Sequence, residues 1–210
     1  MQINQRYKEI ISRYVPETTV DIVLKWVIEN KIFLKISKER KTKLGDYCPP
    51  TRNANHKISV NYNLNKYAFL ITFVHELAHL FIWEKYQNRV KPHGEEWQKE
   101  FLLLMTPLLK QGVFPKDIQK HLEIHLQKGF ASSHSDLSLL RILNKYDKNP
   151  KIVLESLPDN ARFRVPDGRE FIKQKRIKKR FSCLCVNSKR IYSISPMASV
   201  ISLPNDKEII

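Results

Sequence analysis

The chain has 210 residues, of which 42% are apolar and 28% are charged. This balance is that of a folded domain with a sizeable core, with enough chain left for a small second one. No run of about eighteen apolar residues occurs, and the first residues lack the pattern of a secretion signal, so we expect neither a membrane span nor export. Three cysteines without framework spacing favour a reducing compartment, and we expect the cytoplasm.

The formal net charge of +16 at pH 7 is large for a chain of this length. Such an excess of cations favours an anionic partner, most often nucleic acid, although it also serves solubility alone. Nothing in the composition indicates an oligomeric state.

Apolar residues recur at helical spacing over residues 3–14 and again over residues 20–28, which predicts two helices that each bury one face. Alternating apolar and polar residues then predict a strand at residues 32–36, and further strands are expected at residues 42–47 and 57–62. We therefore expect two helices and a small antiparallel sheet ahead of the long apolar stretch that follows.

The stretch from Asn65 to Trp97 contains the sequence His-Glu-Leu-Ala-His at positions 75–79. On a helix, His75 and His79 lie one turn apart, and Glu76 falls within the same arc of about 100°. Apolar residues cover most of the remaining circumference, so the helix should be buried nearly all round and its polar trio needs a compensating partner. One zinc ion bound by both imidazoles would be that partner, although histidines hydrogen-bonded in a core would also fit the pattern.

A catalytic zinc ion usually takes three protein ligands and leaves a fourth position to water. His93 is the best candidate for the third ligand, because a turn at residues 89–92 precedes it and a helix predicted at residues 94–105 follows it, which returns the chain toward the first two ligands. Glu95 or Glu96 would instead give a site of two histidines and one glutamate. The sequence favours His93 and leaves the other arrangement open.

These residues resemble the SprT-like zinc metalloproteases, which share the HExxH sequence, a short loop and a third histidine followed by Gly and an aromatic residue. The matching segments are His75–His79 and Lys91–Trp97, together with Lys43–Tyr47 and Ile58–Asn61, so the resemblance covers about residues 30–105. It implies a zincin-like α+β domain of helices and a small antiparallel sheet, with one Zn²⁺ per chain and a protein or peptide substrate.

A mechanism and a substrate class also follow from the resemblance. His75, His79 and His93 would bind zinc as neutral imidazoles, and Glu76 would be the general base that takes a proton from the activated water. In zincin-type proteases the strand nearest the metal binds the substrate backbone along its exposed edge; here that strand would be Ile58–Asn61, unless it simply closes the sheet. The resemblance further implies proteolysis of DNA-bound or crosslinked proteins.

Farther along the chain, Pro115 opens a helix in which His121 and His125 again stand four residues apart. No Glu follows His121 and no third ligand is evident. We therefore interpret this pair as part of a partly exposed helix face rather than as a second metal site.

Asp147–Pro150 is a predicted domain boundary, because short β-type runs broken by turns replace the helical pattern beyond it. We assign residues 1–150 to the metalloprotease-like domain and residues 151–210 to a small basic antiparallel β module. Many SprT-like proteins carry a four-cysteine zinc ribbon at this place. Cys183 and Cys185 alone cannot form one, so a second zinc ion is not expected.

Six cations gather within residues 173–180, with Phe171 and Phe181 on either side. The arrangement is typical of a nucleic-acid surface with aromatic neighbours, and a solvated strand face that resists aggregation is the alternative. The predicted nucleic-acid contacts are Lys173, Lys175, Arg176, Lys178, Lys179 and Arg180.

Two classes of function are compatible with these patterns. The first is a zinc-dependent peptidase. The second is a nucleic-acid or transcription-complex binding protein in which the zinc site is structural or vestigial. Glu76 favours the peptidase, because a structural zinc site needs no such glutamate and is commonly closed by a fourth protein ligand.

Overall fold

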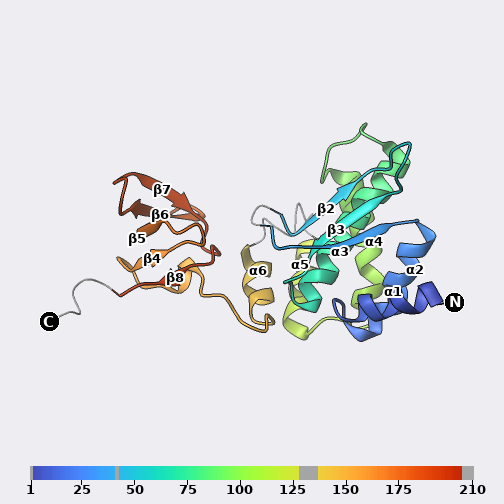
Figure 1. Cartoon of the computed structure of the whole chain (residues 1–210), viewed down its shortest axis with the longest axis horizontal. Helices are drawn as coiled ribbons and strands as arrows, with labels where there is room; N and C mark the ends of the chain where they lie inside the picture. The colour runs from blue at the N-terminus through green and yellow to red at the C-terminus, as the bar shows by residue number, and fades with distance from the viewer. Residues whose placement is uncertain (1, 41–42, 128–136, 205–210) are drawn as a thin grey trace. The chain divides into compact units, whose positions relative to one another are not determined.

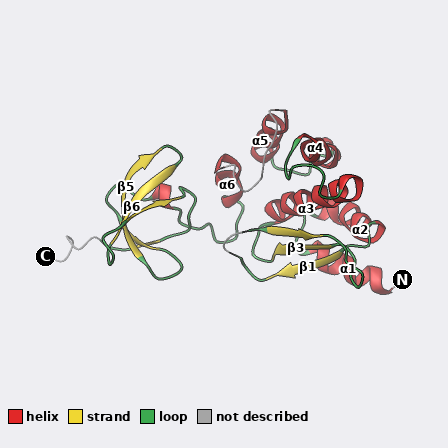
Figure 2. Ribbon diagram, turned by 90° about the horizontal axis from the view of Figure 1, so that it is seen from above, coloured by secondary structure: helices red, strands yellow, loops and turns green. Residues whose placement is uncertain are grey.

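The computed structural model of the chain describes residues 2–40, 43–127 and 137–204. The chain divides into two compact units between Tyr146 and Asp147, close to the boundary expected at residue 150 (Figure 1). The first unit combines helices with a small sheet, and the second is built around a larger sheet (Figure 2), so the predicted α+β class is confirmed. Among the described residues, no helix is both long and apolar enough to cross a membrane.

The helices of the first unit are α1 (Gln2–Ser12), the short η1 (Glu17–Thr19), α2 (Val20–Glu29), α3 (Lys66–Tyr86), α4 (Glu95–Lys110), α5 (Lys116–Gln127) and α6 (Leu137–Asn144). The two helices predicted at the start of the chain are therefore confirmed as α1 and α2. Helix α4 continues through Pro107, whereas we expected it to end near residue 105. Pro107 has no N–H for the carbonyl of Leu103, but Leu103 lies on the exposed side of α4, where water can bond to that carbonyl.

The sheet of the first unit has the order β1 (Phe33–Ser37), β3 (Lys57–Asn61), β2 (Gly45–Cys48). Strand β3 is central; it pairs with β1 in parallel and with β2 in antiparallel fashion. The sheet is thus mixed rather than antiparallel. The prediction that Ile58–Asn61 offers an exposed edge is wrong, because β1 and β2 flank this strand on both sides.

The mixed order arises because the segment after β1 crosses the sheet before β2 begins. Arg40 in this segment donates from Nε to Asn61 Oδ1 at 2.9 Å and from Nη1 to Ser59 Oγ at 3.0 Å. Asn61 Nδ2 in turn donates to the carbonyl of Lys43 at 3.0 Å. These bonds hold the crossing segment over β3, so the chain reaches the opposite edge of the sheet and β2 pairs there.

Helix α3 is the centre of the first unit, between the sheet and α4 (Figure 2). It begins at a strong cap, since Asn65 Oδ1 accepts hydrogen bonds from the backbone N–H groups of Tyr67 and Ala68. Buried side chains occupy every side of the helix from Ala68 to Ala78. The prediction of a helix buried nearly all round is therefore confirmed.

The second unit is a five-stranded sheet with the order β7-β6-β5-β4-β8 and antiparallel pairing throughout. Its strands are β4 (Arg162–Arg164), β5 (Glu170–Ile177), β6 (Arg180–Cys185), β7 (Ile191–Ile194) and β8 (Ile201–Ser202), preceded by the short η2 (Leu154–Ser156). Leu154, Phe163, Phe171 and Cys183 lie in a core of its own. The predicted antiparallel β module is therefore confirmed.

Candidate metal centre

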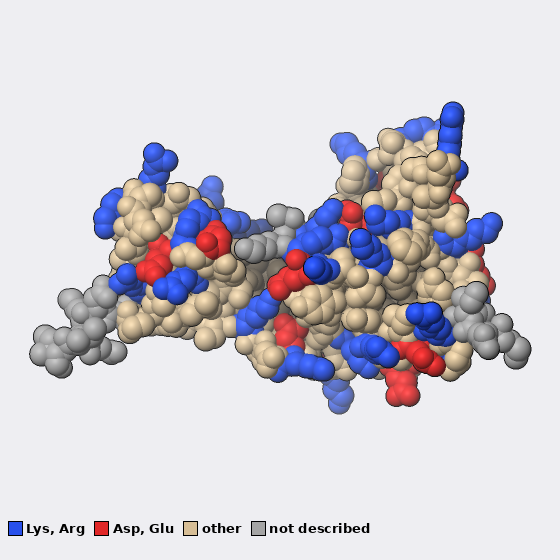
Figure 3. Space-filling view, viewed as in Figure 1, with Lys and Arg blue, Asp and Glu red and all other residues tan. Residues whose placement is uncertain are grey.

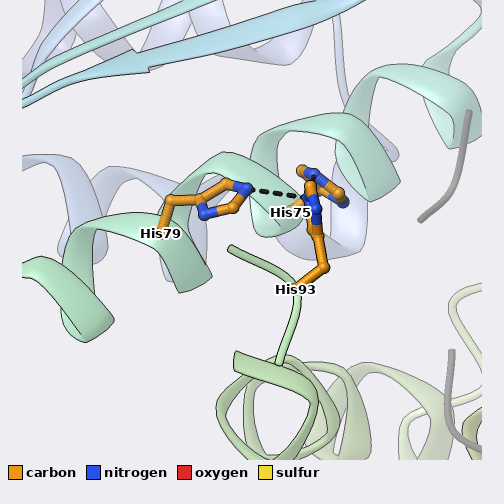
Figure 4. Close-up of side chains that lie close together, drawn as sticks. All are labelled: His75, His79 and His93. Carbon is orange, nitrogen blue, oxygen red and sulfur yellow. Dashed lines mark hydrogen bonds between the residues drawn. The ribbon is translucent and has the colours of Figure 1, made fainter. Parts of the chain in front are cut away.

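Three imidazoles meet beside α3. His75 and His79 project from successive turns of α3, and His93 comes from the loop before α4 (Figure 4). Nε2 of His93 lies 3.0 Å from Nε2 of His79 and 3.0 Å from Nε2 of His75. Among the described residues, these three form the one group whose ligand atoms could hold a metal ion, and it includes neither Glu95 nor Glu96.

The loop between α3 and α4 brings His93 back over the helix. The backbone of Gln87 has φ 53° and that of His93 has φ 58°, a left-handed conformation that few non-glycine residues adopt. Gln98 Nε2 on α4 donates to the carbonyl of His93 at 3.2 Å, which ties the loop to the start of that helix. Strained backbone held by surrounding contacts is typical of functional sites.

Trp97 packs against all three imidazoles. Its ring centroid lies 4.6 Å from that of His75, 5.4 Å from that of His79 and 4.7 Å from that of His93. Phe101 stacks on Trp97, and the centroids of these two rings lie 5.0 Å apart. Both aromatic side chains are fully buried, so α4 fixes the orientation of the histidines by packing.

The protonation of the cluster suits a metal ligand set. Burial lowers the pKa of His79 to about 4, and the neighbouring His93 contributes to the shift. Burial also lowers the pKa of His93. Neutral imidazole nitrogen is a preferred ligand of zinc, and three imidazole nitrogens that converge on one point cannot all satisfy one another by sharing protons. The residues therefore fit a zinc-type ion.

Glu76 lies beside the cluster and is 6% exposed. Burial raises its pKa to about 8, and the carboxylate of Asp46 adds to the rise. A hydrogen bond from the backbone N–H of Tyr47, together with the charges of Arg40 and Lys43, acts in the opposite direction. The carboxyl group thus sits in a low-dielectric setting in which a fixed donor points at it.

Gly45 and Tyr47 of β2 both approach Glu76. From the sequence they stand out only as part of the segment Lys43–Tyr47 that resembles the SprT-like family, with no role at the site. A glycine inside a predicted strand is a general sign of close backbone approach, and Gly45 is such a glycine. The contact itself depends on the pairing of β2 with β3, which no local pattern predicts.

His121 is 9% exposed on α5, so the prediction of a partly exposed helix face is wrong at this position. It faces inward because it lies one turn after Ile118 and beside Leu122, which are both buried in the core. His121 belongs to no metal-binding group among the described residues. The side chain of His125 lies outside the described part of the chain.

The basic segment of the second unit forms the β5–β6 hairpin. Lys173 is 3% exposed, and its Nζ donates to the carbonyl of Leu157 at 2.5 Å and lies 4.3 Å from the ring centroid of Phe181. The prediction that Lys173 contacts nucleic acid is therefore wrong, because strand alternation turns it inward with Phe171. The remaining predicted contacts are exposed: Lys175, Arg176, Lys178, Lys179 and Arg180.

An HExxH helix, a third histidine from the following loop and a small sheet along the helix define a zinc-metallopeptidase-like domain. The chain belongs to the SprT-like family, whose family model matches residues 8–113. The predicted resemblance is confirmed, and the match extends from α1 to the end of α4. Comparisons with curated proteins and with solved structures gave no match.

Proposed function

We propose that the first unit is a zinc-dependent peptidase that hydrolyses peptide bonds, with one Zn²⁺ held by His75, His79 and His93. The observation that carries this proposal is the convergence of three imidazoles, two of which come from the same helix as the buried Glu76. Family membership supports it as well, because the SprT-like fold is zinc-metallopeptidase-like.

When bound, the zinc ion supplies a Lewis acid that polarises a carbonyl and lowers the pKa of water to about 7. Glu76 accepts a proton from the attacking water and returns it to the leaving amide nitrogen. The buried setting of its carboxylate strengthens these interactions by excluding bulk solvent. Trp97 keeps the imidazoles oriented by its contacts with all three rings.

The alternative is a binding protein with a structural or vestigial zinc site. Structural zinc sites are commonly closed by a fourth protein ligand, whereas catalytic sites keep three. The group of ligand atoms found among the described residues has three members. Glu76 adjoins them and would have no role at a purely structural site, so the peptidase is the better account.

A peptide substrate would most readily align with β2. This strand ends the sheet on the side of α3, and its pairing with β3 leaves its other edge open except at the Tyr47 N–H, which bonds to Glu76. Backbone bonds along such an edge bind peptides with little dependence on sequence. We propose β2, in place of the strand expected from sequence, as the site of the substrate backbone.

We propose nucleic acid as a further partner, bound by the exposed cations of the β5–β6 hairpin. Lys and Arg side chains are spread over the visible face of both units (Figure 3), so general attraction to a polyanion accompanies any hairpin contact. DNA-associated proteins would then be the substrates.

The free thiols of Cys48, Cys183 and Cys185 fit a reducing setting such as the cytoplasm.

The peptidase proposal is tested with a library of unstructured peptides, analysed by mass spectrometry for new termini. Zinc-loaded protein should cleave members of the library, a chelator should stop cleavage, and restored zinc should return it. Cleavage that survives complete removal of zinc would contradict the proposal.

A further inference from the structure

We propose that Gly45 is a positioning residue for Glu76: its lack of a side chain lets β2 approach α3 closely enough for the backbone N–H of Tyr47 to hold the Glu76 carboxylate. The inference rests on the proposed function only for the catalytic role of Glu76. The contact itself is a feature of packing and can be tested without activity.

Space, rather than backbone conformation, demands glycine at position 45. A Cβ atom there would lie 2.6 Å from Glu76 Oε1, 2.6 Å from Thr72 Cγ2 and 2.8 Å from Glu76 Cγ. Real side-chain contacts do not come this close, so something would have to move. Among the described glycines, Gly112 and Gly168 have a positive φ, whereas Gly45 does not.

Thr72 cannot easily give way. It is 2% exposed, and its Oγ1 donates to the carbonyl of Ala68 at 2.7 Å, which fixes the direction of Cγ2. Rotation of the side chain would break this buried bond. An added methyl group would therefore displace either the strand or the side chain of Glu76.

The register of β2 explains why the donor is Tyr47. The backbone N–H of Asn61 donates to the carbonyl of Leu44 at 2.9 Å, and antiparallel pairs alternate between bonded and non-bonded. Gly45 and Tyr47 consequently turn their backbone groups away from β3. The N–H of Tyr47 is thus free to bond to Glu76, which is the interaction that opposes the effect of burial on this carboxylate.

Because Gly45 lacks a Cβ, β2 lies close to α3. This short distance allows the backbone N–H of Tyr47 to donate a hydrogen bond to Glu76. A carboxylate that acts as a base must be held within a fraction of an ångström of its working position. A displaced strand would leave zinc bound and move only the base. Gly45 therefore acts through Glu76 rather than on the substrate.

The first test is a double-mutant cycle on thermal unfolding of the zinc-loaded full chain. Gly45→Ala should lower Tm by about 5 °C in the parent and by less than about half of that in a Glu76→Ala background, because part of the clash is gone. Gly112→Ala is the control, since no described atom lies within 4 Å of the added Cβ and its cost comes from φ +64°; this cost should be equal in both backgrounds. Equal costs of Gly45→Ala in the two backgrounds would overturn the inference.

The second test separates the clash with Thr72 from the clash with Glu76, and it applies even if Gly45→Ala alone fails to fold. Thr72→Ser removes Cγ2 and keeps the hydroxyl bond, so it leaves Glu76 as the main neighbour of an added Cβ. The double variant Gly45→Ala/Thr72→Ser is compared with Thr72→Ser alone, and its kcat should be about tenfold to a hundredfold lower, with KM and zinc content unchanged. An unchanged kcat would overturn the inference, whereas a parent that cleaves nothing would instead overturn the proposed function, with the unfolding cycle still deciding the packing claim.

Discussion

The candidate ligands are held in two different ways. Helical spacing alone places His75 and His79 on one side of α3, whereas His93 depends on a loop with left-handed backbone at its start and end. Trp97 joins the two arrangements, because it contacts all three rings. The buried Nε1–H of Trp97 has no hydrogen-bond partner among the described residues, a cost of about 1–3 kcal/mol that indicates that the shape of the ring is what matters here.

Zinc content tests the assignment of the three histidines as ligands. The parent should bind one zinc ion per chain, and His75→Ala, His79→Ala and His93→Ala should each weaken binding by more than about 100-fold, since each removes a direct ligand. His56→Ala is the matched control, because His56 contacts Tyr47 and Glu84 outside the cluster. Metal analysis after dialysis checks this. Tight binding retained in His93→Ala would move the third ligand to a glutamate.

Among the elements, the segment between β1 and β2 has an unexpected structural role. Arg40 makes four hydrogen bonds from its guanidinium to Asn61, Ser59 and Leu44. It thereby covers the polar side of β3, where Ser59 is 3% exposed and Asn61 is 1% exposed. The position of β2, and with it the donor to Glu76, depends on this segment.

Arg40→Ala should therefore lower the free energy of unfolding of the first unit by about 2 kcal/mol, because buried acceptors lose their donors. Arg40→Lys should recover only part of the loss, since an ammonium group cannot reproduce the planar fork. Urea unfolding followed by tryptophan fluorescence measures it, because Trp26, Trp83 and Trp97 all lie in the first unit. Arg52→Ala, at an exposed position, should change little; an equal loss in both variants would contradict the role given to Arg40.

The β5–β6 hairpin yields a prediction on nucleic-acid binding. Lys178→Gln and Lys179→Gln should each reduce the magnitude of the slope of log affinity against log salt by about 0.9 on duplex DNA and about 0.7 on single strands. The reason is that each substitution removes one phosphate contact, so fewer counterions are released on binding. Fluorescence anisotropy at several salt concentrations gives the slopes. Lys110→Gln, an exposed change on α4, is the control. Slopes equal to that of the parent would assign the hairpin to a solvated strand face.

As a whole, the molecule consists of two units with separate hydrophobic cores. The candidate metal centre and the matched family segment lie in the first unit, and the exposed hairpin cations lie in the second. Metal binding should therefore stabilise one unit and leave the other unchanged.

Chelation tests this division in the full chain. Removing zinc should lower the stability of the first unit by about 4 kcal/mol when free zinc had been about 1,000 times its Kd. Hydrogen exchange with mass spectrometry should then show faster exchange in α3 and α4 and an unchanged rate in β5 and β6. A comparable acceleration in β5 and β6 would show that the two units do not respond separately.

Local patterns predicted the parts of the site that lie on one helix, because the spacing of His75, Glu76 and His79 is set by helix geometry alone. They also placed His93 correctly near them, since a turn and a new helix return the chain. They could not predict the parallel pairing of β1 with β3, which depends on Arg40 reaching across the sheet. Charge density alone cannot predict that Lys173 is buried, because the alternation of side chains along β5 turns it inward.

The central claim is tested most directly by the rate of peptide-bond cleavage in the parent and in Glu76→Gln, each loaded with one zinc ion per chain. The substitution spares all three histidines and removes the base, so zinc content and Tm should stay the same while the rate falls by at least about 100-fold. Equal rates in the two proteins, or no cleavage of any peptide by the zinc-loaded parent, would contradict the account.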